Sequence, residues 1–149
     1  MRRFKQGYFS KYKGQEYKTI AVSGGRWRLI SKQANQGFTP CGVSTYCMEI
    51  TPDQVESSYL VQVWVSYKDY HFTINGFNEK ENTVELGVSV SISFDVVERL
   101  FGYRPKSTYE EYMPTIKVDD LDEIWEERKP IEGFPFNEPE KVYFKRKGE

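Results

Sequence analysis

The stretch "SYLVQVWVSY", residues 58–67, decides the fold, because apolar side chains recur at every second position along it. Successive side chains of an extended strand point to opposite faces, so this period of two residues indicates a strand. One face would carry Tyr59, Val61, Val63, Val65 and Tyr67. The opposite face would carry Leu60, Gln62, Trp64 and Ser66. We therefore predict a long strand that turns one face toward a core.

A second stretch, "TVELGVSVSIS" at residues 83–93, alternates in the same way. Its aliphatic residues are Val84, Leu86, Val88, Val90 and Ile92. A helical repeat of about 3.6 residues would scatter these side chains around the helix axis, which excludes a helix. The segment "YHFTINGF" (70–77) follows a Lys68-Asp69 turn and is predicted to form a hairpin with the first stretch. The middle of the chain thus predicts an antiparallel sheet with one core face and one polar face.

Short strands are also predicted toward the N-terminus, where turn residues separate runs of apolar side chains. These strands are "YFSKY" (8–12), "EYKTIAV" (16–22), "RWRLIS" (26–31) and "GVSTYCMEI" (42–50). The Gly24-Gly25 pair between the second and third is typical of a hairpin turn. The polar segment 32–40 contains glycine and proline and is predicted to be a loop.

The C-terminal third changes to helical spacing. The segment 94–101, followed by Gly102, is predicted to be a helix with Val96, Val97, Leu100 and Phe101 on its apolar side. A second amphipathic helix is predicted within "DDLDEIWEERKP" (119–130), ended by Pro130. Its apolar side would carry Leu121, Ile124, Trp125 and the stem of Arg128. The segment 131–141 is irregular, and 141–148 is predicted to add a final strand.

These elements predict a single α+β domain over residues 1–149. Its main part would be a twisted, mainly antiparallel sheet of about six to eight strands, with closure toward a barrel as one option. One or two C-terminal helices would pack beside this sheet. A chain of this length buries roughly 70% of its unfolded surface, so one core is sufficient without metal ions or disulfide bonds.

The sequence also favours a cytoplasmic location and no membrane partner. It has no run of about 18 apolar residues, and no apolar region follows its basic N-terminus as a signal peptide requires. Its two cysteines are Cys41 and Cys47. If "CGVSTYC" is extended, these residues lie about 20 Å apart, which is too far for a disulfide bond. We therefore expect both thiols to be reduced.

Charge is distributed unevenly along the chain, although its net value is −1. Residues 1–35 hold nine lysines and arginines against Glu16 alone, and the remainder holds 12 basic residues against 21 acidic ones. Charge of one sign that is gathered on a surface steers an oppositely charged partner. Both an acidic and a basic partner-binding surface are therefore worth considering.

The acidic surface is predicted on the second helix. Its candidate residues are Asp119, Asp122, Glu123, Glu126 and Glu127. No calcium-loop spacing is present, and crowded, exposed carboxylates lack the apolar pocket that a catalytic acid needs. Acids in the first helical turn gain about 0.3–1 kcal/mol from the helix dipole, whereas like-charged i,i+4 pairs cost about 0.2–0.5 kcal/mol each. A docking face and a merely solvated face both stay open.

The basic surface is predicted on the N-terminal strands, where lysine and arginine alternate with aromatic residues. Its candidate residues are Lys11, Lys13, Lys18, Arg26, Trp27 and Arg28. Platforms for single-stranded nucleic acid combine such cations with stacking aromatic rings. The alternative hypothesis is therefore a β-barrel-like module that binds single-stranded nucleic acid or a small ligand, although the pI of about 6.0 disfavours nucleic acid.

No enzyme, metal or cofactor is predicted. His71 is the single histidine, so a Ser-His-Asp triad would have to include it, and a lone histidine on a strand is more often structural. Zinc sites need three or four Cys and His ligands at set spacings, and the chain has three such residues in all. The "SGGR" segment lacks the phosphate-loop pattern.

The segments "GYFSKYKGQEYK" (7–18), "RLIS" (28–31) and "DEIWEERKPIEGFPF" (122–136) resemble small cytoplasmic immunity proteins. Gram-positive bacteria pair such proteins with secreted polymorphic toxins. The resemblance implies a non-enzymatic bacterial inhibitor that neutralises a cognate toxin by stoichiometric protein–protein contact. Such toxins are often nucleases with a basic cleft. The resemblance transfers no binding residue, and the acidic docking face is our own inference from charge steering.

Overall fold

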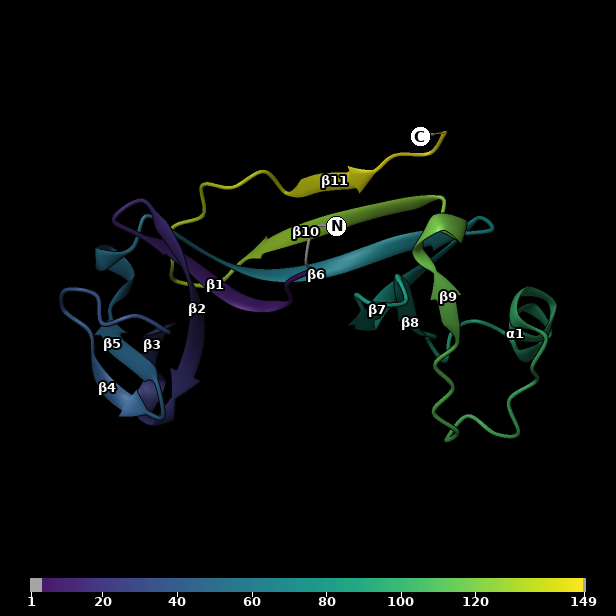
Figure 1. Cartoon of the computed structure of the whole chain (residues 1–149), viewed down its shortest axis with the longest axis horizontal. Coiled ribbons are helices and arrows are strands. Elements are labelled where there is room, and N and C mark those ends of the chain that lie inside the picture. Colours follow the sequence, from purple (N-terminus) through teal and green to yellow (C-terminus); the bar gives the residue numbers. More distant parts are fainter. Residues whose placement is uncertain (1–3, 149) are drawn as a thin grey trace. The chain divides into compact units, whose positions relative to one another are not determined.

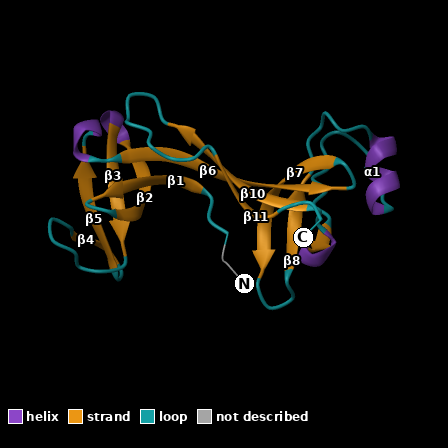
Figure 2. Ribbon diagram, turned by 90° about the horizontal axis from the view of Figure 1, so that it is seen from above, coloured by secondary structure: helices purple, strands orange, loops and turns teal. Residues whose placement is uncertain are grey.

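The computed structural model describes residues 4–148, in which antiparallel strands dominate and a single α-helix, α1 (Phe94–Phe101), occurs (Figure 1). The strands are β1 Gly7–Tyr12, β2 Gln15–Val22, β3 Arg26–Ser31, β4 Thr39–Gly42, β5 Thr45–Ile50, β6 Ser57–Tyr67, β7 Tyr70–Asn78, β8 Thr83–Gly87, β9 Thr115–Lys117, β10 Glu123–Pro130 and β11 Lys141–Lys145. Short 3-10 helices span Ser23–Gly25, Pro52–Gln54 and Val118–Asp120. The α+β class with a mainly antiparallel sheet is therefore confirmed (Figure 2). Arg2 and Arg3, which we counted in the basic segment, lie outside the described residues.

The described chain forms two compact units, which we treat separately. The N-terminal unit comprises residues 5–62 and 127–141. The central unit comprises residues 63–126 with the described residues 4 and 142–148. Strands β6 and β10 each continue from one unit into the other.

In the N-terminal unit, the strands lie in the order β4-β5-β3-β2-β1-β6, and each is antiparallel to its neighbour. Leu29 at the centre of β3 is fully buried and packs with Phe38, Ile50 and Val55. Residues directly opposite in an antiparallel pair share a face of the sheet. Leu29 lies opposite Thr19 and Met48, so this face of β2, β3 and β5 is the core face.

In the central unit, the strands follow the order β6-β7-β8-β9. Its core joins buried residues of β6, β7 and β8 to Leu100 of α1, and includes Val63, Val65, Phe72, Ile74, Val84 and Leu86. The alternation predicted for 58–67 is confirmed, because Tyr59, Val61, Val63 and Val65 are at most 1% exposed. The helix predicted over 94–101 is also confirmed. The Ser93 hydroxyl caps it, and Gly102 ends it in the left-handed region, with φ of 74°.

The second predicted helix is wrong, since residues 123–130 form strand β10. This strand pairs with β6 and β11, and Figure 1 shows the three running side by side. Glu126 and Glu127 would repel Asp122 and Glu123 across one helical turn. In a strand with a rise of about 3.3 Å per residue, residues four apart are separated by about 13 Å, which relieves this repulsion. The strand therefore has less charge repulsion than the helix would have, and pairing with β6 and β11 stabilises it further.

Two further expectations about the sheet are wrong. Strand β8 ends at Gly87 rather than continuing to 93, and the chain turns at Ser89, whose carbonyl accepts a hydrogen bond from Ile92 N. The sheet does not close into a barrel, because the strand order runs from β4 to β9 without pairing these two strands. Alternation of residues reports which face they share, but it carries no information about where pairing stops.

The prediction of reduced cysteines is also wrong, because Cys41 and Cys47 form a disulfide bond. Residues 39–50 are a hairpin of β4 and β5 rather than a loop followed by one extended strand. The chain reverses at Val43 and Ser44, and Ser44 has a positive φ of 50°. The reversal brings the two Cα atoms to 5.8 Å, within the range for a disulfide bond.

Candidate partner-binding surface

The face of β2, β3 and β5 opposite the core carries a mixed group of cationic and aliphatic side chains. Arg28 lies opposite Ile20 on β2 and Glu49 on β5. Two residues to either side along β3, Ile30 lies opposite Lys18 and Arg26 lies opposite Val22. We call this surface the open face; it consists of Lys18, Ile20, Val22, Arg26, Arg28, Ile30 and Glu49.

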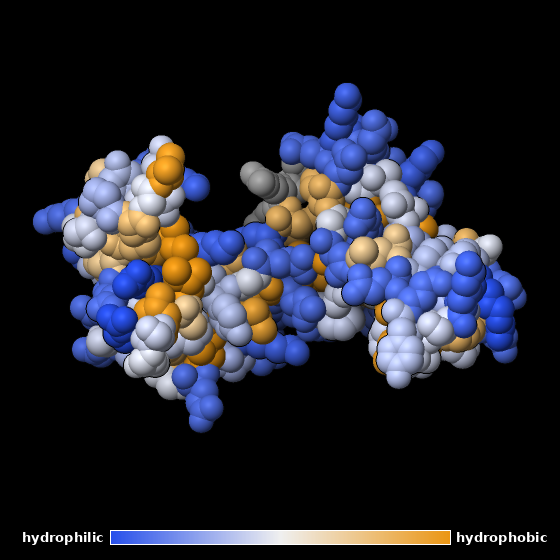
Figure 3. All heavy atoms as spheres, turned by 90° about the horizontal axis from the view of Figure 1, so that it is seen from below, coloured by the Kyte–Doolittle hydropathy of each residue, from blue (hydrophilic) through white to orange (hydrophobic). Residues whose placement is uncertain are grey.

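The aliphatic residues of the open face are not part of a hydrophobic core. Ile20, Val22 and Ile30 are half-buried, and the core cluster of this unit does not include them. In the space-filling view, hydrophobic atoms are visible on the surface of the N-terminal unit among hydrophilic ones (Figure 3). Aliphatic side chains on a solvated sheet face, bordered by charges, are typical of an interaction surface.

Arg28 is the distinctive charge of the open face. Glu49 lies directly opposite it, but the Glu49 carboxylate accepts a hydrogen bond from Arg26 Nη1 at 2.7 Å. The Arg28 guanidinium, although half-buried, has no ion pair or side-chain hydrogen bond with any of residues 4–148. It borders a hollow of about 450 Å³ whose other lining residues are Thr39, Pro40, Cys41, Cys47 and Glu49. A carboxylate of a partner would complete the hydrogen bonds of this guanidinium as a bidentate pair.

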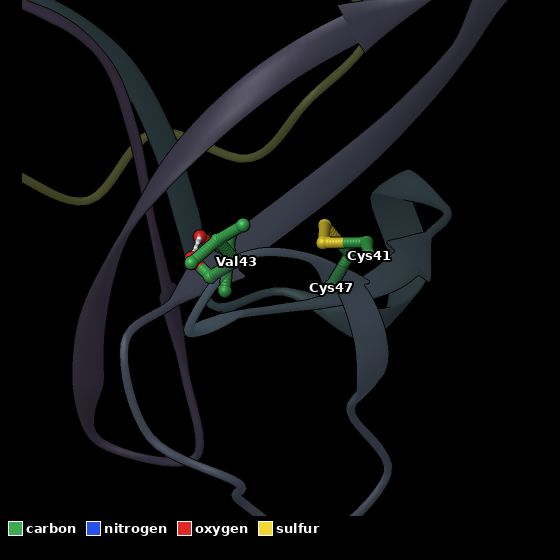
Figure 4. Close-up of a disulfide and its surroundings, with 4 residues drawn as sticks. Cys41, Val43 and Cys47 are labelled. Carbon is green, nitrogen blue, oxygen red and sulfur yellow. Dashed lines mark hydrogen bonds between the residues drawn. A yellow bond between two sulfur atoms is a disulfide. The ribbon is translucent and has the colours of Figure 1, made fainter.

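The β4–β5 hairpin, whose two cysteines line this hollow, carries an apolar residue at its tip. Val43 at its tip is 94% exposed. The Thr45 hydroxyl donates to the Val43 carbonyl oxygen at 2.9 Å, and the disulfide bond joins the two strands behind the tip (Figure 4). The tip is therefore restrained by a hydrogen bond and a disulfide bond while its apolar side chain faces solvent.

At the β1 end of the same sheet face, charges are paired within the protein. Glu16 accepts hydrogen bonds from Lys5 Nζ and from the hydroxyl of buried Tyr59. Burial raises the pKa of Glu16, but these two hydrogen bonds outweigh it and hold that pKa below its ordinary value of 4.5. Burial and the Glu16 carboxylate together raise the pKa of Tyr59. This group is an internal network of paired side chains.

A second internal network joins the segment 127–141 to β1. The Glu138 carboxylate is 3% exposed and pairs with Lys11 Nζ at 2.7 Å. Arg128 Nη1 lies 3.8 Å from the same carboxylate, and its guanidinium covers the Tyr59 ring at 5.9 Å. Buried charges are stable only when they are paired in this way.

The predicted acidic residues do not form one exposed face. Asp119 is exposed, whereas Glu126 is 1% exposed. Half-buried Asp122 and Glu123 accept hydrogen bonds from Lys68 N at 3.0 Å and Ser66 Oγ at 3.2 Å. Half-buried Glu127 follows Glu126 on β10, and adjacent residues of a strand point to opposite sides. Lys145 on the neighbouring strand β11 also donates to the Leu121 carbonyl oxygen at 2.6 Å.

The predicted basic residues separate into three places. Lys18, Arg26 and Arg28 lie together on the open face. Trp27 lies on the core face, opposite Ala21 and Ile50, where its ring contacts Tyr8 and Phe134. Lys11 pairs with Glu138, and Lys13 lies in the β1–β2 turn with its ammonium over the Tyr12 ring at 5.3 Å. Trp27, the stacking ring expected between these cations, therefore does not lie on the open face.

The central unit has apolar surface of its own, around the loops that flank α1. Val90, Tyr109 and Met113 are exposed there, next to a hollow of about 40 Å³. This hollow has room for a few water molecules only.

His71 contacts the Trp125 ring at 5.1 Å. Within residues 4–148, no three His, Cys, Asp or Glu side chains gather around a position for a metal ion, and no helix is long and apolar enough to cross a membrane.

Sequence reasoning missed Ile20, Ile30, Glu49 and Val43 as surface residues. A usable signal was present for Ile30: in "RWRLIS" alternation alone places Ile30 on the same face as Arg26 and Arg28. The role of Val43 depends on the hairpin reversal, for which the sequence offers no Asn-Gly or Gly-Gly pair.

A family model described as "Uncharacterised conserved protein UCP033725" matches residues 4–133. Comparisons with curated proteins and with solved structures found no match.

Proposed function

Since the chain belongs to the family described as "Uncharacterised conserved protein UCP033725", a description that states no activity, we propose a function from the geometry of the open face. The protein acts as a non-enzymatic inhibitor, an immunity protein in the bacterial sense, that binds and neutralises a cognate toxin. Binding uses protein–protein contacts centred on Arg28.

The observation that carries this proposal is the half-buried guanidinium of Arg28, which has no side-chain partner among residues 4–148 and lies among half-buried aliphatic side chains. Interfaces combine an apolar centre with a few charged groups, and arginine is enriched among the residues that dominate their binding energy. Ile20 and Ile30 supply the apolar area, and Lys18 adds positive charge at the edge. The partner surface that fits is apolar with at least one carboxylate.

The polarity of this interface is opposite to the one predicted from the sequence. The acidic residues of 119–127 are distributed between buried, half-buried and exposed positions, which does not support steering of a basic nuclease cleft. The proposal therefore moves the binding surface to the open face and assigns the contacted carboxylate to the toxin.

The test is direct binding to the protein encoded by the adjacent gene, together with survival of cells that express it. We expect Arg28→Glu to weaken binding at least about tenfold, because it replaces an attractive interfacial pair with a like-charge contact. Lys80→Glu, on the exposed turn between β7 and β8, makes the same charge change as a control and should leave affinity and protection unchanged. Equal affinity of both variants would refute the open face as the binding surface.

The alternative function, binding of single-stranded nucleic acid or a small ligand, is favoured by the grouping of Lys18, Arg26 and Arg28 on one face. It is disfavoured by the position of half-buried Trp27 on the core face, because sequence-tolerant binding of single strands relies on aromatic stacking. Salt-dependent retention on single-stranded DNA that Arg28→Glu abolishes would establish this alternative instead.

We propose the cytoplasm as the place of action, as the resemblance to immunity proteins implies. The disulfide bond disfavours this location, because such bonds are rare in reducing compartments such as the cytoplasm. Alkylation of Cys41 and Cys47 in intact cells, followed by mass spectrometry, measures their oxidation state and so tests the location.

A further inference from the structure

We propose that the β4–β5 hairpin is a redox-gated docking element: while the Cys41–Cys47 disulfide is intact, Val43 inserts into an apolar pocket of the partner protein next to the carboxylate that Arg28 binds. This inference rests on the proposed function for the identity of the partner. It adds a second contact, a chemical description of the partner's surface and a condition under which binding occurs.

The first argument is the exposure of Val43 on a restrained tip. A valine that is 94% exposed contributes nothing to the core. Its backbone is nevertheless held by the Thr45 hydroxyl, by the turn at Ser44 and by the disulfide bond (Figure 4). Binding orders flexible loops at an entropic cost, and a loop that is already ordered avoids that cost. An apolar side chain on such a tip is suited to enter a pocket.

The second argument is that little besides the disulfide holds β4 in place. All four residues of β4 are exposed, and β4 lies at the end of the strand order, paired with β5 alone. Pro40 has no N–H to donate, and the register shifts between Pro40 and Gly42. A short edge strand with an irregular ladder has few competing restraints. Loss of the disulfide bond therefore frees the tip.

The third argument is that the same disulfide borders the hollow beside Arg28. Cys41 and Cys47 line it together with Thr39, Pro40 and Glu49. A change at the two sulfurs consequently alters the apolar tip and the charged hollow at once. This shared wall couples the two contacts that the partner makes.

The redox step is a thiol–disulfide exchange with a dithiol reductant. The reductant gives up two electrons and two protons, its sulfurs join as a disulfide, and the Cys41–Cys47 bond becomes two thiols. The chain has no other cysteine, so a reductant acts at this position alone. The partner is a protein rather than a membrane, because one valine buries too little apolar area for membrane binding, and the hollow that the two cysteines line carries Arg28 and Glu49.

The experiment measures two quantities on the full chain. Hydrogen exchange at residues 39–47, with and without dithiothreitol, reports whether the disulfide restrains the hairpin; we expect at least tenfold faster exchange after reduction. The dissociation constant for the adjacent gene product is then measured for wild type, Val43→Ser and the Cys41→Ser/Cys47→Ser double variant. We expect both variants to bind about tenfold more weakly, and reduction to weaken the wild type to the level of the double variant.

Val90→Ser provides the matched control. Val90 is also a highly exposed valine, but it lies in the loop after β8 and has no disulfide nearby. Its substitution should leave affinity unchanged, and dithiothreitol should not alter binding by the double variant. Unchanged hydrogen exchange on reduction, or affinity that is insensitive to Val43→Ser, overturns the inference. Val43-dependent binding to phosphatidylglycerol vesicles overturns the assignment of a protein partner.

The binding measurements with the different variants distinguish failure of this inference from failure of the proposed function. If Arg28→Glu abolishes binding while Val43→Ser and reduction do not affect it, the proposed function stands and the inference fails. If Val43→Ser and reduction weaken binding while Arg28→Glu does not, the hairpin contact stands and the Arg28 interface fails. If the adjacent gene product does not bind at all, both are refuted.

Discussion

At the scale of single residues, Glu16 shows how a partly exposed carboxylate becomes part of the structure. Lys5 and the buried hydroxyl of Tyr59 both donate to it. Its folded pKa is below the ordinary value of 4.5, so the unfolded chain binds the proton more tightly. The stability that this group contributes is therefore present above pH 4.5 and is lost as pH falls below 4.5 through the folded pKa.

Tyr59→Phe tests this account. The substitution removes one donor to a carboxylate, and hydrogen bonds to charged groups contribute about 1.5–3 kcal/mol. We expect the free energy of unfolding at pH 7 to decrease by an amount within that range. We also expect the loss of stability below pH 4.5 to be smaller than in the wild type. Urea denaturation at several pH values measures both. Tyr109→Phe, at a highly exposed tyrosine, should leave both unchanged.

Glu126 leads to a second prediction at this scale. A lysine at this position, where Glu126 is 1% exposed, would place a positive charge in a buried site. Taking one charged group out of water costs several kcal/mol, so we expect Glu126→Lys to lose several kcal/mol of stability. Asp119→Lys, at an exposed position of the same acidic segment, should change stability little. Equal melting temperatures of the two variants would contradict the buried position of Glu126.

At the scale of elements, the β4–β5 hairpin and β10 show the same principle. Few local features of the sequence indicate the structure of either segment. Each segment is instead stabilised by pairing with a strand distant in sequence or by a covalent bond. For the hairpin this is the disulfide bond, which closes a short loop. For β10 it is pairing with β6 and β11.

Removing the disulfide bond tests the hairpin. The chain-entropy relation gives about 2 kcal/mol for a loop of this length. We expect the Cys41→Ser/Cys47→Ser variant to lose about that much stability in guanidinium denaturation. Dithiothreitol should reduce the stability of the wild type equally and leave the variant unchanged. A variant as stable as the oxidised wild type would show that β4 is held by other contacts.

Ile124 tests β10. Its side chain is 2% exposed and belongs to the core of the central unit. Replacing a buried isoleucine by alanine costs about 2–5 kcal/mol, which we expect for Ile124→Ala. Lys129→Ala, at an exposed position on the same strand, should cost less than about 0.5 kcal/mol. A cost at Ile124 as small as that at Lys129 would contradict its buried position.

At the scale of the whole molecule, β6 and β10 supply residues to both compact units. Unfolding of one unit therefore removes the continuation of two strands from the other. We expect thermal unfolding to be one cooperative transition, as the predicted single domain implies. Trp27 reports on the N-terminal unit and Trp125 on the central unit, so versions that retain one of these tryptophans can follow each unit separately. Coincident transitions are expected, and two separated melting temperatures would show that the units fold independently.

The sequence by itself determined the alternating strand at 58–67 and the helix at 94–101, because their period and caps are local properties of consecutive residues. It also placed the cations of the open face on the correct strands. Only the tertiary structure decided that 123–130 is a strand, that Cys41 meets Cys47 and that Trp27 turns inward while Arg28 faces solvent. Each of these depends on the pairing of strands, which fixes register and the buried face. Such non-local contacts outweigh the few tenths of a kcal/mol that local helical preferences contribute.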